Sequence, residues 1–350
     1  MLNLFGLTYV QLQEFCQSEG LPKFAARQMA DWLYAKRTDA IDAMTNLSLK
    51  ARARIGEVAT IQWLTPVDCQ VSRDGTKKYL FSVADLDTLT TNHYVEAVYI
   101  PDDDRATLCV SCQVGCKMAC RFCVTGQQGF HGNLDTSHIL SQIVSIPEFE
   151  KLTNIVFMGM GEPMDNYENV LRATQVLTSE WGFAWSPRRI TVSSVGITPM
   201  LRRFLDESQC HLAVSLHNPF PEQRLEIMPM QKAFPMADTL ALLKQYDWTG
   251  QRRISFEYTM FQGLNDTLVH AAELVRVLQG LPCRVNLIRF HTSPNTPFRT
   301  SSDRTIIAFK DYLNKHGVTC TLRASRGQDI MAACGLLAGQ ARGNQNSKKS

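Results

Sequence analysis

The sequence has no long apolar run. None approaches the ~20 consecutive apolar residues that a membrane-spanning helix needs. The first residues, MLNLFGLTYVQLQEF, also lack the basic n-region with which a secretory signal begins. We therefore expect a cytoplasmic protein that makes no contact with a membrane.

The chain also has little excess charge. Its formal net charge is +3 over 350 residues, which excludes a uniformly basic surface of the nucleosome-binding kind. Basic pairs still occur locally, among them Arg188-Arg189 and Arg252-Arg253. Such pairs can contact phosphates and make binding salt-dependent. For each pair taken alone, a solvated face is the simpler interpretation.

A disulfide framework is not expected, although cysteine is plentiful. The chain has 11 cysteines, and thiols stay reduced in the cytosol. Five of them lie between positions 109 and 123. Five others lie in apolar, periodic surroundings and are predicted to be small buried core residues: Cys16, Cys69, Cys210, Cys283 and Cys320. Cys334 does not fit that group.

The cysteine-rich segment CVSCQVGCKMACRFC places Cys116, Cys120 and Cys123 in a C-x3-C-x2-C spacing. This spacing is typical of radical S-adenosylmethionine (SAM) enzymes. Fe–S clusters are usually held by four thiolates, so three cysteines leave one iron of a [4Fe-4S] cluster open, and in that superfamily SAM binds there. Four of the five cysteines could instead hold a structural zinc. Only the radical SAM interpretation also predicts a β/α barrel and a SAM site after the loop.

The remaining pattern predicts an accessory region followed by a barrel. Thr8 with Gln11 predicts a capping box, and Gly20 a C-cap, so residues 1–62 are expected to be a helical accessory domain. Residues 63–101 read as a β-hairpin and a strand. The barrel is expected over 102–338, and the polar tail 339–350 is expected to be disordered.

After the cysteine loop, β-rich runs alternate with helical stretches, which predicts parallel βαβ units. The runs are TNIVFMGM, RRITVSSVG, CHLAVSLH, RRISFEYTMF, CRVNLIRF and TCTLRAS. Six such units suit an α/β fold built on a partial (β/α)6 barrel. Working residues of barrels sit at the C-terminal ends of strands, and here those ends are polar. We therefore expect the active site at that mouth.

These segments together resemble the RlmN family of dual-specificity 23S rRNA and tRNA adenine methyltransferases, within the radical SAM superfamily. The resemblance covers nearly the whole chain. It rests on FAARQMADWLYAK near the N-terminus, YVEAVYIP, the cysteine loop with the following VTGQQGF, GMGEP, SLH and GQDIMAACG.

The resemblance implies methylation of carbon 2 of an adenine, with a [4Fe-4S] cluster and two SAM molecules per turnover. One SAM methylates Cys334 on sulfur. The other is cleaved to a radical that takes a hydrogen from this methyl group, and the carbon radical adds to the base. Cys109 matches the resolving cysteine, which frees the product through a transient disulfide with Cys334. Glu96 matches the proton acceptor; on the residues alone, it would be an ordinary strand carboxylate facing water.

The resemblance also nominates SAM contacts at the strand ends. At one position it departs from the family, because His291 stands where many members have a SAM-contacting Asn; imidazole can still donate or accept a hydrogen bond. Cys112 replaces a common Ser and is expected to be neither ligand nor nucleophile. The nominated contacts are Gly161, Glu162, Ser193, Ser215, Leu216, His217 and His291.

The implied partners are 23S rRNA, at the peptidyl transferase centre, and tRNA, at the adenosine 3′ to the anticodon. A flavodoxin-like or ferredoxin-like electron donor would reduce the cluster, and the protein is expected to be a monomer. The N-terminal helices would help to grip folded RNA by shape and phosphate contacts.

Three alternatives remain open. A related antibiotic-resistance methyltransferase modifies carbon 8 of the same rRNA adenine with equivalent cysteines, but QQGF and the surroundings of GQDIMAACG are more like the carbon 2 enzymes. A radical SAM activase that acts on a protein would not need the pair Cys109 and Cys334. A non-catalytic RNA-binding protein with a structural zinc would leave SAM uncleaved.

Overall fold

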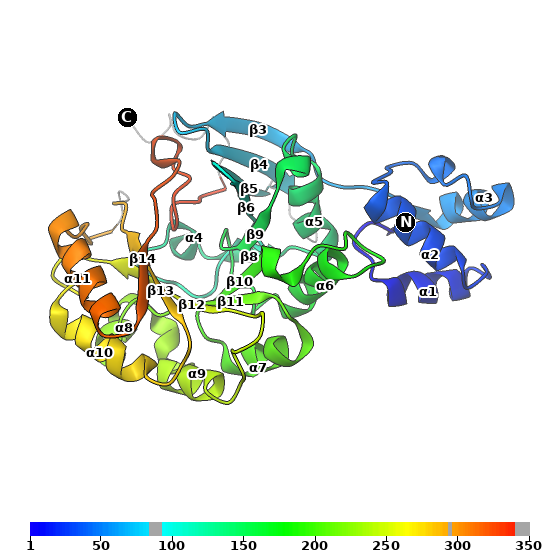
Figure 1. Cartoon of the computed structure of the whole chain (residues 1–350). Coiled ribbons are helices and arrows are strands. Elements are labelled where there is room, and N and C mark those ends of the chain that lie inside the picture. Colours follow the sequence, from blue (N-terminus) through cyan, green and yellow to red (C-terminus); the bar gives the residue numbers. More distant parts are fainter. Residues whose placement is uncertain (84–92, 293–295, 340–350) are drawn as a thin grey trace.

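A ten-stranded sheet runs through the structure, a computed structural model that describes residues 1–83, 93–292 and 296–339 (Figure 1). Seven of its strands pair in parallel and form the partial barrel. One of them, β6, comes before the cysteine loop and was not among the six predicted strands. The seven are β6 (Arg105–Cys109), β9 (Asn154–Phe157), β10 (Ile190–Ser194), β11 (His211–Ser215), β12 (Ile254–Met260), β13 (Arg284–Arg289) and β14 (Thr319–Leu322).

Helices connect these strands and cover the outside of the sheet (Figure 1). The sheet is enclosed, so its central strands are largely buried, and six of the seven residues of β12 are buried. The expected partial radical SAM barrel is therefore confirmed. The helices are α5 (Thr136–Val144), α6 (Tyr167–Thr178), α7 (Thr198–Glu207), α8 (Pro221–Ile227), α9 (Met236–Leu243), α10 (Leu268–Leu278) and α11 (Asp303–Lys315).

The β-hairpin extension continues the barrel sheet. Strands β3 (Pro66–Val71), β4 (Lys77–Val83) and β5 (His93–Asp102) pair antiparallel, and β5 pairs with β6. The prediction that Cys69 is a buried core residue was wrong, because β3 is an edge strand and Cys69 lies on its exposed face. Cys283 is only half-buried, whereas Cys16, Cys210 and Cys320 are buried as predicted.

The N-terminal region contains the helices α1 (Tyr9–Ser18), α2 (Ala25–Ala30) and α3 (Leu49–Val58). The capping box is present: Thr8 accepts from the Gln11 N–H, and the Gln11 side chain accepts from the Thr8 N–H. A parallel pair, β1 (Leu2–Asn3) with β2 (Ala59–Thr60), closes this region. Gly20 has φ +65°, as a left-handed helix end requires.

The segment after β14, residues 323–339, runs back towards β3 and β4 (Figure 1). It carries Cys334 across the C-terminal ends of the barrel strands. The predicted disordered tail lies, from residue 340 onwards, outside the described residues. Among the residues that are described, no helix combines the length and apolar composition that crossing a bilayer needs.

Candidate active site

One cavity lies at the C-terminal ends of the parallel strands and receives side chains from three parts of the chain. It brings together the residues named from the sequence, except Glu96, Leu216 and His291. From the cysteine loop and its preceding strand come Cys109, Cys116, Cys120 and Cys123; from the strand ends come Gly161, Glu162, Ser193, Ser215 and His217; and from the C-terminal segment comes Cys334.

The cysteine loop is closed at its base by a short antiparallel pair, β7 (Gln113–Gly115) and β8 (Phe130–Asn133). Gly115 has φ +74°, and a Cβ atom there would lie 1.9 Å from the Gly129 carbonyl oxygen, so only glycine fits. That carbonyl accepts the Cys116 N–H at 2.8 Å. Helix α4 (Val124–Gln127) begins directly after Cys123. The loop is thus fixed on both sides of its three thiols.

These thiols fit an iron–sulfur cluster. Burial raises the pKa of Cys116 to about 12, and it also raises the pKa of Cys123; coordination by a metal ionises such thiols. Three soft sulfur donors facing one cavity leave one iron of a [4Fe-4S] cluster for another ligand.

Glu162 gives the cavity a buried carboxylate. One of its oxygens accepts the Met164 N–H at 3.1 Å and the other accepts the Val195 N–H at 3.0 Å. Burial raises the pKa of Glu162 to about 7, against the opposing effect of hydrogen bonds from Ser194, Val195 and Met164. A carboxylate held in this way favours a cationic partner. The ammonium group of SAM is such a partner, so the site fits this cofactor as well.

His217 is held as a neutral donor at the end of β11. Its Nδ1 accepts the Thr259 N–H at 3.0 Å, which leaves the ring proton on Nε2. Burial and the nearby Arg224 lower the pKa of His217 to about 3, so the ring stays neutral near pH 7. The ring also packs edge-on against Phe122, with centroids 4.9 Å apart. His217 therefore offers the cavity an N–H whose orientation is fixed.

Cys109 and Cys334 reach the cavity from different elements. Cys109 is buried at the last position of β6, whereas Cys334 is exposed on the C-terminal segment, and both thiols are free. Burial, together with the neighbouring Cys334, raises the pKa of Cys109 to about 12, and Arg323 opposes this rise. The Arg323 guanidinium pairs with the buried Glu257 at 3.3 Å. The two thiols therefore share one cationic neighbour.

Glu96 does not line the cavity but is bound to the segment that carries Cys334. One of its carboxylate oxygens pairs with the Lys78 ammonium at 3.0 Å, and the other accepts the Ala338 N–H at 2.8 Å. Both side chains of the ion pair are buried. The alternative of a strand carboxylate facing water is wrong for Glu96, because β4 and the C-terminal segment cover it.

His291 and Leu216 also lie outside the cavity lining. The His291 ring is half-buried and lies 3.0 Å from the Ser325 hydroxyl. Leu216 is fully buried, and its carbonyl accepts from the Arg224 guanidinium at 3.0 Å. Cys112 is buried beside the cavity without lining it, and its N–H donates to the Met160 carbonyl.

Sequence reasoning missed three charged residues of the site. Glu257 and Arg323 line the cavity, and Arg224 is fully buried behind it. The Arg224 guanidinium donates to the carbonyls of Val195, Ser215 and Leu216, and so fixes the loops after β10 and β11. A signal existed for the first two, because both stand in polar strand-end motifs. For Arg224, inside a helical stretch, no sequence pattern indicated burial.

Family models match two parts of the chain. The Ribosomal RNA large subunit methyltransferase N-terminal domain matches residues 2–61, and the Radical SAM superfamily matches residues 110–275. Radical SAM enzymes use a [4Fe-4S] cluster and SAM, which confirms the expected cofactors.

Relatives match over nearly the full length. A "Probable dual-specificity RNA methyltransferase RlmN" of Bacteroides fragilis (strain YCH46) is 54% identical over 98% of both chains. A "Dual-specificity RNA methyltransferase RlmN" of Syntrophus aciditrophicus (strain SB) is 41% identical over 97% of both. A crystal structure of a radical SAM methyltransferase from Sphaerobacter thermophilus superposes with a TM-score of 0.87 at 39% identity, covering 97% of this chain and all of that one. The chain belongs to the RlmN family of radical SAM methyltransferases.

Proposed function

We propose that this enzyme methylates carbon 2 of adenine in 23S rRNA, at the peptidyl transferase centre, and in tRNA, at the adenosine 3′ to the anticodon. Its RlmN relatives are named as dual-specificity RNA methyltransferases, which supports RNA as the substrate class. The observation that carries the proposal is the pair of free thiols, Cys109 and Cys334, in the cavity that also holds the three cluster cysteines.

The bound cluster and SAM would supply the methyl group and the radical that activates it, with Cys116, Cys120 and Cys123 as iron ligands. Glu162 would pair with the SAM ammonium, and Ser193, Ser215 and the Nε2–H of His217 would supply polar contacts. Gly161 and Leu216 belong to the same strand-end loops. His291 would need to leave Ser325 to make its contact, because the two side chains now lie 3.0 Å apart.

Cys334 would carry the one-carbon unit on its sulfur and pass it to the adenine ring. Its exposure gives an incoming base access to it. Glu96 would accept the proton from carbon 2 of the covalent adduct. The Ala338 N–H already joins its carboxylate to the Cys334 segment, and Lys78 fixes the carboxylate from the other side.

Cys109 would release the product. Its thiolate sulfur bonds to the Cys334 sulfur, and the carbon–sulfur bond breaks with its electron pair going to the adduct carbon, which takes up a proton to become the methyl group. The disulfide that remains must be reopened by an external reductant. Arg323, near both thiols, would favour the thiolate form. We place the reaction in the cytoplasm, with a monomeric enzyme and a flavodoxin-like or ferredoxin-like electron donor.

The test compares three cysteine variants in cells that lack the native gene. We expect Cys334→Ala and Cys109→Ala to reduce 2-methyladenosine in both rRNA and tRNA to below about a hundredth of the wild-type level, because both act in one sequence of steps. Purified Cys109→Ala should also accumulate RNA covalently bound to protein. Cys112→Ser is the matched control, since Cys112 does not line the cavity, and it should keep methylation.

Mass spectrometry of nucleosides from separately purified rRNA and tRNA gives the answer. Normal 2-methyladenosine in the Cys109→Ala strain would refute the release step. Detection of 8-methyladenosine in place of 2-methyladenosine would show that the enzyme methylates carbon 8 of adenine instead of carbon 2. If the cysteine variants lose 2-methyladenosine from rRNA but keep it in tRNA, the substrate of this enzyme is rRNA and not tRNA.

A further inference from the structure

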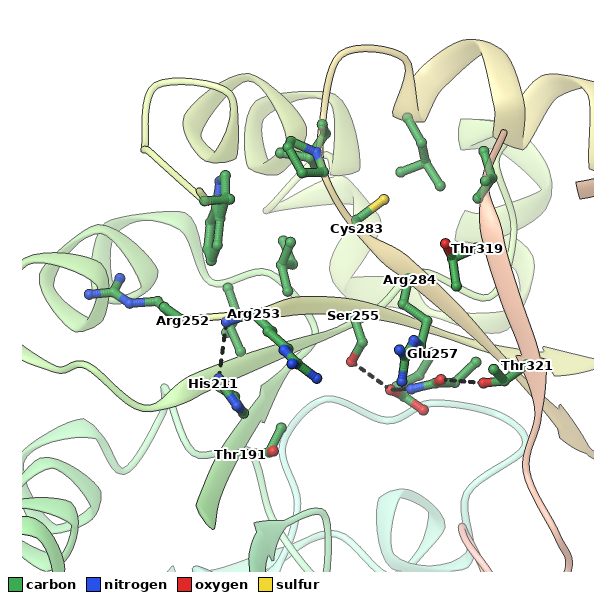
Figure 2. Close-up of a pocket in the computed structure, with 18 of the residues that line it drawn as sticks. Thr191, His211, Arg252, Arg253, Ser255, Glu257, Cys283, Arg284, Thr319 and Thr321 are labelled. Atoms are coloured by element: carbon green, nitrogen blue, oxygen red, sulfur yellow. Dashed lines mark hydrogen bonds between the residues drawn. The ribbon is translucent and has the colours of Figure 1, made fainter. Parts of the chain in front are cut away.

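A second large cavity, of about 1190 Å³, opens at the opposite end of the barrel (Figure 2). Its lining includes Thr191, His211, Ser255, Arg284 and Thr319, which lie at or near the first residues of five consecutive strands. The active-site cavity lies at the last residues of these strands. Val156, Met158, Glu257 and Arg323 line both spaces, so the Glu257–Arg323 ion pair and two apolar side chains lie between the two cavities.

The lining of this distal cavity is strongly cationic. Among the described residues, it includes seven arginines and one carboxylate, Glu257. Like charges around a low-dielectric space repel one another and focus a positive potential into it. The arginines are Arg105, Arg188, Arg252, Arg253, Arg276, Arg284 and Arg323.

Some of these guanidinium groups are already engaged. Arg323 pairs with Glu257 and Arg276 with Glu273. Arg252 turns away from the cavity to the carbonyls of Leu205 and Ser208, as its direction in Figure 2 shows. Arg105 donates to the Asn154 side chain.

Three guanidinium groups remain available. In the part of the chain that the structure describes, Arg188, Arg253 and Arg284 are exposed and have no carboxylate partner. Figure 2 shows Arg253 and Arg284 extending from β12 and β13 into the same space, with Arg284 directed towards Glu257. Forked guanidinium groups of this kind match phosphate oxygens in geometry and charge.

The positive charge of these arginines affects the pKa of His211. Its Nδ1 accepts the Arg253 N–H at 3.0 Å, so Nε2 carries the proton of the neutral ring (Figure 2). Burial and then Arg253, Arg188 and Arg252 lower the pKa of His211. The positive charge of three arginines therefore acts on the His211 ring in the cavity lining.

Part of the cavity lining is apolar. It includes Trp248, Val275, Leu278, Leu281 and Val318. The hydroxyl groups of Thr191, Ser255, Thr319 and Thr321 also line the cavity and can donate to anionic oxygens (Figure 2). A ligand that matches this lining combines several negative charges with an apolar group.

We propose that the distal cavity binds a nucleoside polyphosphate, with its phosphates on Arg188, Arg253 and Arg284 and its base against the wall around Trp248. The ligand would bind on the face remote from the cysteine loop, so the proposal is independent of the RNA position that the enzyme methylates. Ligand cavities commonly combine an apolar lining with a few placed polar groups.

The test is isothermal titration of ATP, without magnesium, into the anaerobically purified holoenzyme. The enzyme is first saturated with SAM, because the adenosine part of ATP could otherwise enter the active site. We expect one ATP site per chain. Each arginine that contacts phosphate is worth about tenfold in affinity, so Arg253→Gln with Arg284→Gln should weaken binding roughly a hundredfold.

Matched controls separate this site from general charge effects. Arg202→Gln with Arg304→Gln removes the same charge from exposed residues that do not line the cavity, and it should leave ATP affinity unchanged. Arg253→Lys with Arg284→Lys keeps the charge and should lose less affinity than the glutamine pair. Cluster absorbance and SAM cleavage, measured on each variant, should stay at the wild-type level and so confirm that it folds.

Three results would overturn the proposal. The first is equal ATP affinity in the Arg253/Arg284 and Arg202/Arg304 glutamine variants, or a heat of ATP binding that disappears when the enzyme is saturated with SAM. The second is inorganic tripolyphosphate binding as tightly as ATP, which would remove the base from the proposal. The third is a loss of affinity for an RNA hairpin, but not for ATP, in the Arg253/Arg284 glutamine variant. That result would mean that the mouth of the cavity contacts RNA.

Discussion

At the scale of single residues, buried charges decide how the barrel is organised internally. Arg224 is fully buried, and its guanidinium fixes two strand-end loops by donating to their carbonyl groups. The pair Glu257–Arg323 lies between the two cavities and lines both of them. An unpaired charge at such depth would be costly, so each of these groups is tied to named partners.

His211 makes the distal cavity sensitive to pH. The pKa of the ring is lowered in the free protein, so the ring is neutral near pH 7. A bound polyanion would offset the three neighbouring arginines and raise this pKa, so binding would take up a proton as the pH falls below about 6.5. We therefore predict that ATP affinity, relative to a variant without this imidazole, increases from about pH 8 to about pH 6.

The variant is His211→Asn, whose side-chain oxygen can still accept the Arg253 N–H. ATP gains protons over this range in both proteins, so the ratio of their affinities isolates the imidazole. Calorimetric titrations at both pH values should give a ratio that shifts several-fold in favour of the wild type at the lower pH. A ratio that does not change with pH would contradict the role of His211.

Site residues that stand in motifs with a distinctive spacing could be predicted from the sequence. Residues whose role depends on their burial in the fold could not. The cluster cysteines, Cys109 and Cys334 stand in motifs, and the structure brings them to one cavity. The ion pair of Lys78 with Glu96 had no such signal, because strand pairing between β4 and β5 creates it. Cys69 was misplaced for the same reason, since sheet order decides which strand lies at the edge.

At the scale of elements, the Cys334 segment is held between two anchors. On one side, the Asp74 carboxylate in the β3–β4 turn accepts the Gly327 N–H at 2.9 Å, and Asp329 accepts the Ser72 hydroxyl and the Arg73 N–H. On the other side, the Gly335 carbonyl accepts the Val124 N–H of α4 at 2.8 Å. The hairpin extension therefore has a part in placing Cys334.

We predict that Asp74→Asn with Asp329→Asn loosens this segment and lowers RNA methylation roughly tenfold, with a smaller effect on SAM cleavage. Burial opposes ionisation of Asp74, but hydrogen bonds from Gly327, Thr76 and Ser72 lower its pKa to about 2. This stabilising contribution is present above the unfolded pKa near 4 and is lost only as the pH falls through about 2. Substitution is thus the practical way to remove it.

Hydrogen–deuterium exchange of residues 327–339 measures the loosening directly. The matched control is Asp104→Asn, which neutralises an exposed carboxylate in the β5–β6 turn, and it should change neither exchange nor methylation. Unaltered exchange in the double variant would show that the hairpin does not position Cys334.

The order of helices and strands along the chain was largely predictable from the sequence. The pairing of the hairpin strands with the barrel strands in one sheet was not. Capping residues and β-rich runs indicated α1, the hairpin and six barrel strands, because those signals are local. β6 was missed, because its five residues run directly into the cysteine loop without a turn signal. That β5 pairs with β6, so that hairpin and barrel form one sheet, depends on contacts between segments that no local pattern records.

At the scale of the whole molecule, the N-terminal helices stand to one side of the barrel (Figure 1). An aromatic contact joins the two parts. Trp181, from the loop after α6, stacks on Tyr9 with ring centroids 6.2 Å apart and meets Tyr34 at 5.9 Å. The Arg37 guanidinium adds a cation–π contact with Phe149 of the barrel. The N-terminal region therefore has a defined position relative to the active site.

We predict that Trp181→Ala weakens RNA binding roughly tenfold while SAM affinity and cluster content stay at the wild-type level. Removing the indole deletes packing between the two parts, worth about 1.4 kcal/mol for such a tenfold change, without touching the cavity. Tyr312→Ala is the matched control: this half-buried ring stacks on His316 at the end of α11 and has no contact with the aromatic residues of this junction. Binding of labelled tRNA and of an rRNA fragment is measured for each variant. Equal loss in both variants would mean that removing either ring acts by destabilising the barrel alone, whereas loss confined to Trp181→Ala requires that RNA is gripped by the N-terminal region and the barrel together.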